Sequence, residues 1–160
     1  IFYDAIIMAK AALERSGKNL NLDGLYCYDL PVEIMLPAAG QGVIGVECRT
    51  DDKEIYNLLR KINHKKTELT TLAEREFLYG MQGNCHTAIG VYAEIKNAEL
   101  KITGVISEES GKNSYKITRK TKKLNQPEKT GSDAAKKLIE KITNEKGTKY
   151  LKQKLNAKQN

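Results

Sequence analysis

The sequence predicts an α+β fold, in which helices cover one face of a three-stranded antiparallel sheet. Three observations predict it. Residues 67–79 carry apolar side chains at helical spacing, and from residue 89 to residue 106 the apolar period changes to two. A second helical pattern begins near residue 132. Because only short turns separate the consecutive strands, an antiparallel meander is expected rather than a parallel sheet with crossovers.

The first predicted helix covers residues 1–13, which are apolar on nearly every side. A helix of this kind needs protein on several sides. It is expected to end at Gly17, a residue typical of the position after a helix. Because no initiator Met precedes it and its partner surface is missing, we expect the chain to be the C-terminal part of a longer polypeptide.

Residues 18–30 are polar and predict a connector, after which residues 32–36 alternate in polarity and residues 43–48 form a short apolar strand. Asp51 and Glu54 resemble a capping box, so a helix should follow. Residues 63–66 are polar and basic and form a candidate domain boundary. The helix before that boundary should bury one stripe of side chains: Ile55, Leu58, Leu59 and Ile62.

The second amphipathic helix, residues 67–79, should end at Gly80 and lead into an exposed turn over residues 81–87. Its inward face consists of Leu69, Leu72, Ala73 and Phe77. The strand residues that alternate are Ile89, Val91, Ala93 and Ile95, then Leu100, Ile102, Gly104 and Ile106, and finally Tyr115 and Ile117. The last helix should turn Ala134, Ala135, Leu138, Ile139 and Ile142 inward.

The 160 residues suit one ordinary domain, or one domain with a fragment of another. Their net charge of +7 is uneven, because residues 1–111 carry 12 basic and 16 acidic side chains and residues 112–160 carry 15 and 4. Such a basic segment could contact nucleic acid. However, Arg119 is its one arginine, whereas specific phosphate and base recognition usually depends on arginine. A solvated surface is favoured, and a non-catalytic basic domain that contacts nucleic acid remains the alternative function.

No apolar run approaches the roughly 18 residues of a membrane span, and no secretion signal is visible. Three cysteines do not form a disulfide framework in a chain of this size, so they should be reduced thiols. We therefore expect a cytoplasmic protein.

The candidates for chemistry are two histidines and three cysteines that are scattered rather than closely paired, so no metal site is expected. Cys48 lies in a strand pattern and should be a buried small hydrophobe, and Cys27 is equally unremarkable. Cys85 differs, because it follows Gly83 in a turn at the seam between helix and sheet. A reactive thiol needs exposure and room, which such a loop supplies. An incidental surface thiol remains the other reading.

Residues 36–49, LPAAGQGVIGVECR, closely resemble the LPAxGQGxxGxExR signature of the porphobilinogen deaminases, also called hydroxymethylbilane synthases. Upstream, residues 3–13 resemble the family's YDAIILAxAGL helix at the matching distance. Downstream, residues 73–75 resemble its AER segment, and residues 83–90 resemble its cysteine loop and the I-G strand that follows. Within that loop Asn84, His86 and Ala88 depart from the family pattern.

The resemblance implies an enzyme of tetrapyrrole (heme) biosynthesis. Family members link four porphobilinogen molecules head to tail into hydroxymethylbilane and release ammonia each time. They hold a dipyrromethane cofactor through a thioether to the cysteine that matches Cys85. A polarizable thiolate suits this attachment, because loss of ammonia leaves an electrophilic carbon. Besides Cys85, the cofactor-binding residues that the resemblance implies are Gln41, Gly42 and Gly83.

In the family the catalytic aspartate and most of the carboxylate-binding arginines lie in the N-terminal half. No catalytic residue is therefore assigned here, and we expect the chain alone to be inactive without that missing half as its partner. In family terms, the segments are incomplete pieces of two α/β domains followed by a cofactor-carrying domain and a tail. Their expected bounds are residues 1–16 for the end of the second domain, 17–62 for the returning first domain, 63–145 for the C-terminal α+β domain and 146–160 for the Lys-rich tail.

Overall fold

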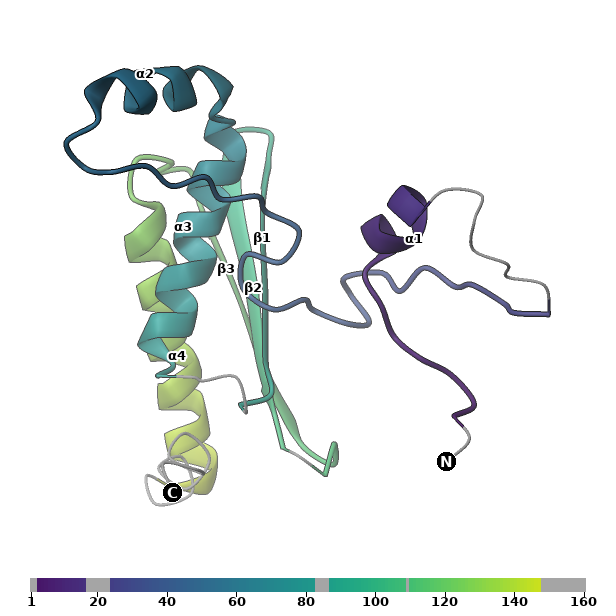
Figure 1. Ribbon diagram of the computed structural model, residues 1–160. Helices are drawn as coiled ribbons and strands as arrows, with labels where there is room; N and C mark the ends of the chain where they lie inside the picture. Colours follow the sequence, from purple (N-terminus) through teal and green to yellow (C-terminus); the bar gives the residue numbers. More distant parts are fainter. Residues whose placement is uncertain (1–2, 17–23, 83–86, 109, 148–160) are drawn as a thin grey trace.

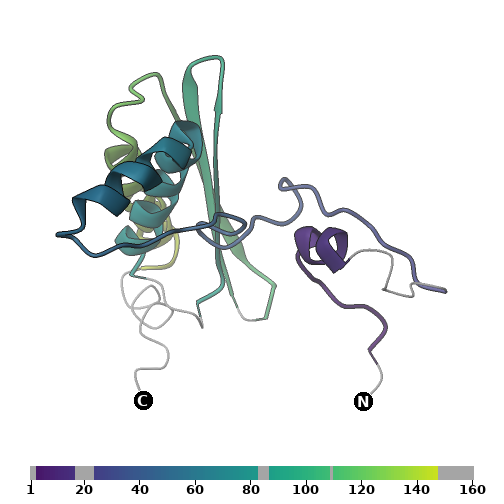
Figure 2. The same ribbon diagram turned by 45° about the horizontal axis from the view of Figure 1, so that its top comes forward.

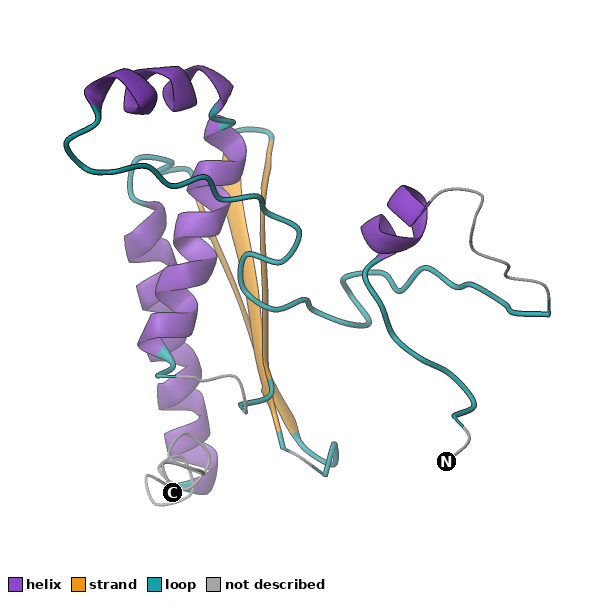
Figure 3. Ribbon diagram, in the orientation of Figure 1, coloured by secondary structure: helices purple, strands orange, loops and turns teal. Residues whose placement is uncertain are grey.

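The structure, a computed structural model, describes residues 3–16, 24–82, 87–108 and 110–147, and it confirms the α+β class. Figures 1 and 3 show two long helices beside a sheet, and a more irregular N-terminal segment that reaches away from them. The elements in chain order are α1 (Lys10–Ser16), α2 (Lys53–Ile62), α3 (Lys65–Gly80), β1 (Ile89–Lys96), β2 (Glu99–Ser107), β3 (Ser114–Thr121) and α4 (Pro127–Lys146).

The sheet is the predicted antiparallel meander, with the strands in sequence order β1-β2-β3. Ile89 pairs with Ile106, and Ile106 pairs in turn with Tyr115. The first hairpin turns at Asn97 and Ala98, which both have positive φ (50° and 57°). This turn lies one residue later than the period of the strands indicates. Two positive-φ residues are the geometry of the type I′ turn, whose twist matches that of the flanking strands.

Helices α3 and α4 lie side by side and cover one face of the sheet, as Figures 1 and 2 show from two directions. The core lies between these two layers, and Phe77 of α3 is completely buried at its centre, over Gly104 of β2. Burial of the apolar side chains here supplies the main driving force for folding. The other buried apolar residues are Ala73, Met81, Val91, Ala93, Leu100, Ile102, Ile106, Tyr115, Ala134, Ala135, Leu138 and Ile142.

Three details of the helical layer differ from the prediction. Of the face expected for α3, Ala73 and Phe77 are buried, whereas Leu69 and Leu72 are only half-buried. Met81, expected in an exposed turn, is fully buried, because it continues the spacing of Ala73 and Phe77 along the inner face of α3. Helix α4 begins at Pro127, five residues earlier than Ser132, and proline is well suited to the first helical position. The sequence did not indicate this earlier start, because Gly131 follows it and glycine is a poor helix former.

The N-terminal segment departs most from the prediction. The helix expected over residues 1–13 is wrong for residues 3–9, which are irregular, and α1 has only seven residues. Tyr3, Ile6 and Ile7 are 77%, 74% and 70% exposed. Since short helices depend on burial of an apolar face, residues without such a surface have little to stabilise a helix.

The two strands expected in this segment are also wrong. Residues 32–35 form a turn, and residues 43–49 have no regular structure. A strand needs a neighbouring strand for its backbone N–H and C=O groups, and in the described part of the chain residues 43–49 have none. Alternating polarity alone therefore does not form the strand.

Helix α2 forms as predicted, but its start and its surroundings differ. Asp52, not Asp51, caps the helix, and its carboxylate accepts a hydrogen bond from Ile55 N (3.0 Å). The stripe expected to be buried is exposed at Ile55, Leu58 and Ile62, because no other described element packs against α2. Among the helices described here, none combines the length and the apolar composition that a bilayer span requires.

Candidate functional site

Residues 36–42, the start of the signature segment, form a loop held against α3 and β1. Val91 N donates to Pro37 O (2.8 Å), and Gly40 N donates to the Glu74 carboxylate (2.8 Å to Oε2). The loop is closed internally, because Ala38 N donates to Gln41 Oε1 (3.2 Å). Gly40 has φ +69°, a left-handed conformation that glycine adopts without the strain that a Cβ would bring. Residues within the loop thus set its shape, and Glu74 and Val91 provide its attachment.

Glu74 is the residue that joins the loop to the sheet. Its side chain is only 7% exposed, and its second oxygen, Oε1, accepts from Ala93 N in β1 (2.7 Å). Each carboxylate oxygen is therefore occupied by one backbone N–H, from two segments that are far apart in the sequence. Burial raises the pKa of Glu74 above its usual value, and the two backbone N–H donors partly offset that rise.

A cavity of about 390 Å³ lies between this loop, the first half of α3 and the second half of β1. Gln41 and Gly42, two of the four residues predicted to bind a cofactor, line it together with Glu74. Lys66 and Lys96 also line it, and Lys96 is paired with Glu94 (2.8 Å). The remaining lining residues are Pro37, Val43, His64, Thr67, Thr70, Thr71, Tyr92, Ala93, Glu94 and Ile95.

The other two predicted cofactor residues, Gly83 and Cys85, lie outside the described residues. The described residues on either side of them, Gln82 and Thr87, are not part of the 390 Å³ cavity. Helix α3 ends at Gly80, six positions and about 9 Å of helix beyond Glu74, and Gln82 follows that end. The structure therefore places Gln41 and Gly42 at the wall of one cavity.

The remaining thiols and histidine have ordinary surroundings. Cys27 is exposed, and Cys48 is only half-buried rather than buried, because the strand expected around it does not form. His64 is the N-cap of α3, where its Nδ1 lies 2.7 Å from Thr67 Oγ1. Within the described ranges, no group of three or more His, Cys, Asp or Glu residues could hold a metal ion.

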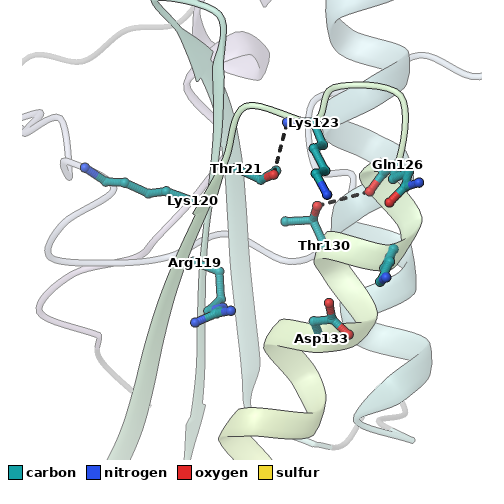
Figure 4. Close-up of a pocket in the computed structure, with 8 residues that line it drawn as sticks. Arg119, Lys120, Thr121, Lys123, Gln126, Thr130 and Asp133 are labelled. Carbon is teal, nitrogen blue, oxygen red and sulfur yellow. Dashed lines mark hydrogen bonds between the residues drawn. The ribbon is translucent and has the colours of Figure 1, made fainter.

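A second cavity, of about 260 Å³, lies between the end of β3 and the first turns of α4 (Figure 4). Arg119 lies on the side of β3 that faces α4, whereas Lys120 extends away from that helix and lies 3.8 Å from Glu99. Thr130 donates to Gln126 O (3.0 Å), and Asp133 places a carboxylate in the same cavity. This basic region contains none of the predicted cofactor residues.

Sequence reasoning did not assign a role to Glu74, although it quoted this residue in the AER segment. A usable signal was present in the helix itself. Glu74 lies between Ala73 and Phe77 on an apolar face, and its neighbours at i−4 and i+4, Thr70 and Leu78, provide no basic partner. An acidic residue in such a position needs hydrogen-bond donors from outside its own helix.

The raised pKa of Glu74 predicts a pH effect on stability. In the folded state this carboxyl should bind its proton more readily than in the unfolded chain. The free energy of unfolding of the wild type, relative to Glu74→Gln, should therefore fall as the pH rises from below 4.5 through the raised folded pKa. NMR titration of the Glu74 carboxyl carbon gives that pKa directly, and a midpoint below 4.5 would contradict the prediction.

Comparisons with known proteins match both parts of the chain. The family model described as "Porphobilinogen deaminase, C-terminal domain" matches residues 68–140. The model described as "Porphobilinogen deaminase, dipyromethane cofactor binding domain" matches residues 2–57. Together the two matches include most of α3, the sheet, most of α4 and the loop that contains Gln41 and Gly42.

Curated relatives agree with these models. A porphobilinogen deaminase of Brevibacillus brevis is 44% identical over 117 residues, which are 72% of this chain and 37% of the relative. One of Geobacillus kaustophilus is 37% identical over 155 residues, or 91% of this chain and 48% of the relative. One of a Nostoc species is 43% identical over 116 residues, or 72% and 35%. The chain thus spans less than half the length of these relatives.

Proposed function

Because the chain belongs to the porphobilinogen deaminase family, we propose that it forms part of a transferase that joins four porphobilinogen molecules into hydroxymethylbilane with release of ammonia. One observation carries this proposal. Models of two different porphobilinogen deaminase domains match consecutive parts of the chain, residues 2–57 and 68–140. The alternative, a basic domain that contacts nucleic acid through residues 112–160, has no support from these comparisons and is not proposed.

We propose further that Cys85 carries the dipyrromethane cofactor through a thioether and that Gln41, Gly42 and Gly83 bind it. The 390 Å³ cavity supports the assignment of Gln41 and Gly42, because both residues line a hollow beside the C-terminal domain. When bound, the cofactor serves as the primer to which substrate units are added. A thiolate at Cys85 would form the carbon–sulfur bond that retains this primer, and thioethers resist hydrolysis better than oxygen esters.

We propose that the catalytic acid and most carboxylate-binding arginines come from an N-terminal part of the polypeptide. The greater length of the relatives supports this proposal, because the matched residues are 37% and 48% of two of them. Residues 1–16 and 17–62 would then complete two α/β domains together with that part. Residues 63–145 would form the C-terminal domain, in a cytoplasmic enzyme. The exposed side chains of α2 and of residues 3–7 are consistent with surfaces that another part of the protein covers.

Turnover of porphobilinogen tests the proposed activity. The chain is fused to, or co-expressed with, the N-terminal part of the Geobacillus kaustophilus relative, and hydroxymethylbilane is measured. We expect turnover by the combined protein and none by the 160-residue chain alone. No product from the combined protein would contradict the proposed activity, and steady turnover by the chain alone would contradict the proposed need for an N-terminal part.

Peptide mass mapping tests the role of Cys85. In the combined protein, expressed with porphobilinogen available, the peptide containing Cys85 should gain the mass of two pyrrole units. The gain should vanish in Cys85→Ser, together with turnover, because serine does not provide the nucleophilic thiolate. Cys48→Ser is the matched control and should keep both. A two-pyrrole gain at Cys48, or full activity of Cys85→Ser, would overturn the assignment.

A further inference from the structure

The N-terminal segment is attached to the C-terminal domain at one place among the residues described. Neither α1 nor α2 packs against another described element. Contact occurs instead over residues 32–43. Val32 and Glu33 line a small cavity against all three strands, Ala39 packs against the core, and Pro37 O accepts from Val91 N. Gly90 lies so close to Leu36 that a Cβ on it would come within 2.8 Å of Leu36 O. The position of this loop therefore depends on a small number of contacts with α3 and β1.

Glu74 provides the contact that reaches the turn itself. Pro37 and Ala39 hold the first half of the loop, whereas Gly40 N is held by Glu74 Oε2. Gln41 and Gly42 follow Gly40 directly and line the 390 Å³ cavity. The same carboxylate accepts a hydrogen bond from Ala93 N at Oε1. The Glu74 side chain therefore connects the turn at Gly40 to the backbone of β1.

From this geometry we infer that Glu74 is a positioning residue: its carboxylate holds the turn at Gly40 and thereby places Gln41 and Gly42 in the cavity. The inference rests on the proposed function, in which those two residues bind the cofactor. Glu74 itself is not assigned contact with substrate or cofactor. Its role is to connect the signature loop to the C-terminal domain, whose sequence includes Cys85.

A carboxylate of this length is required for chemical reasons. Both oxygens of an ionised Glu are acceptors, and both partners here are N–H donors. Glutamine would present its NH₂ group to one of these donors, and alanine would leave both N–H groups without that partner. Loss of a hydrogen bond to a charged group in a site this buried costs enough free energy to raise the fraction of molecules with a detached loop by about tenfold or more.

Loss of this contact should affect the loop more than the core. Helix α3 is held independently by Ala73, Phe77 and Met81, which are completely buried. The Gly40 amide should therefore lose protection in Glu74→Gln, while amides of β2 such as Ile102 keep theirs. A residue with a merely structural role would instead lower the protection of both.

The experiment uses the combined protein of the preceding subsection, with Glu74→Gln and the control Glu76→Gln. Glu76 lies two residues after Glu74 in α3, about 200° around the helix axis. Glu76→Gln therefore makes the same chemical change on a different face of the helix. Hydrogen exchange at Gly40 and Ile102, cofactor content by mass, and kcat and KM are measured. For Glu74→Gln, compared with the wild type at one fixed pH, we expect exchange at Gly40 about tenfold faster and kcat about tenfold lower, with a clearly smaller change in exchange at Ile102. Glu76→Gln should match the wild type.

The inference is overturned if Glu74→Gln retains wild-type protection at Gly40, or if Gly40 and Ile102 lose protection equally. Should Glu74→Gln fail to fold, Glu74→Asp replaces it. Its shorter carboxylate should still accept from one donor and restore an intermediate protection at Gly40, and failure of that variant to fold as well also counts against the inference. Absence of turnover in the wild-type combined protein would contradict the proposed function alone, since the exchange measurement still decides the role of Glu74.

Discussion

Replacing Gly131 by alanine should destabilise the protein by about 3 kcal/mol, although alanine is the better helix former by about 1 kcal/mol. Gly131 lies in α4 where this helix approaches α3 most closely. A Cβ at this position would lie 2.1 Å from the Ala73 carbonyl oxygen and 3.0 Å from Phe77 N. Both atoms belong to the backbone of α3, so the clash can be relieved only by moving the helices apart. That movement would loosen the core between them.

Urea denaturation of the wild type, Gly131→Ala and Asn144→Ala measures this effect. Asn144 is an exposed residue of the same helix, so its substitution by alanine should be neutral or slightly stabilising. Gly131→Ala should therefore lower the free energy of unfolding, whereas Asn144→Ala should leave it unchanged or raise it slightly. A Gly131→Ala protein as stable as the wild type would show that α3 and α4 are farther apart than the structure places them.

Substitution of Gly104 by alanine should also cost about 3 kcal/mol, for a different reason. Gly104 lies in β2 directly beneath the ring of Phe77, and an added Cβ would lie 2.1 Å from Cζ and less than 3 Å from both Cε atoms. Phe77 is completely buried, so its ring has no adjacent space into which it could turn. The sheet and α3 would have to separate.

A double-mutant cycle with Phe77→Leu isolates this contact. Leucine is shorter than phenylalanine, so it should leave room for a methyl group at residue 104. Gly104→Ala should then cost less than about 1 kcal/mol in the Phe77→Leu background, which gives a favourable coupling of about 2 kcal/mol. Equal costs in the two backgrounds would show that another contact, and not the ring of Phe77, is responsible.

The C-terminal half of the fold could be predicted from the sequence because its periodicity is satisfied within the same segment. The alternating residues of β1 and β2 have partners a short turn away, and the apolar face of α3 has the sheet to cover. The strands expected at residues 32–36 and 43–48 fail for the opposite reason. Their pattern is equally clear, but no described strand pairs with their backbone.

The candidate site divides in a similar way. The signature around Gln41 and Gly42 could be recognised from residue types and spacing alone, and the structure places both in one cavity. The apolar face around Glu74 indicates that it needs donors from outside its helix, but not which donors, since Gly40 and Ala93 lie 34 and 19 residues away and contribute only backbone N–H groups. Backbone donors leave no residue-type pattern in the sequence.

The sequence by itself determined the α+β class, the order of the strands, the inward face of α4, and the family to which the chain belongs. These properties follow from local periodicity and from motifs that a linear chain displays directly. Only the tertiary structure decided that Met81 is buried, that α4 begins at Pro127, and that Gly131 and Gly104 are sites of close approach. It also decided that Glu74 connects the loop to the sheet. The two glycine contacts and the contacts of Glu74 depend on atoms brought together from distant segments, and their separation in space is set by packing rather than by any one segment's composition.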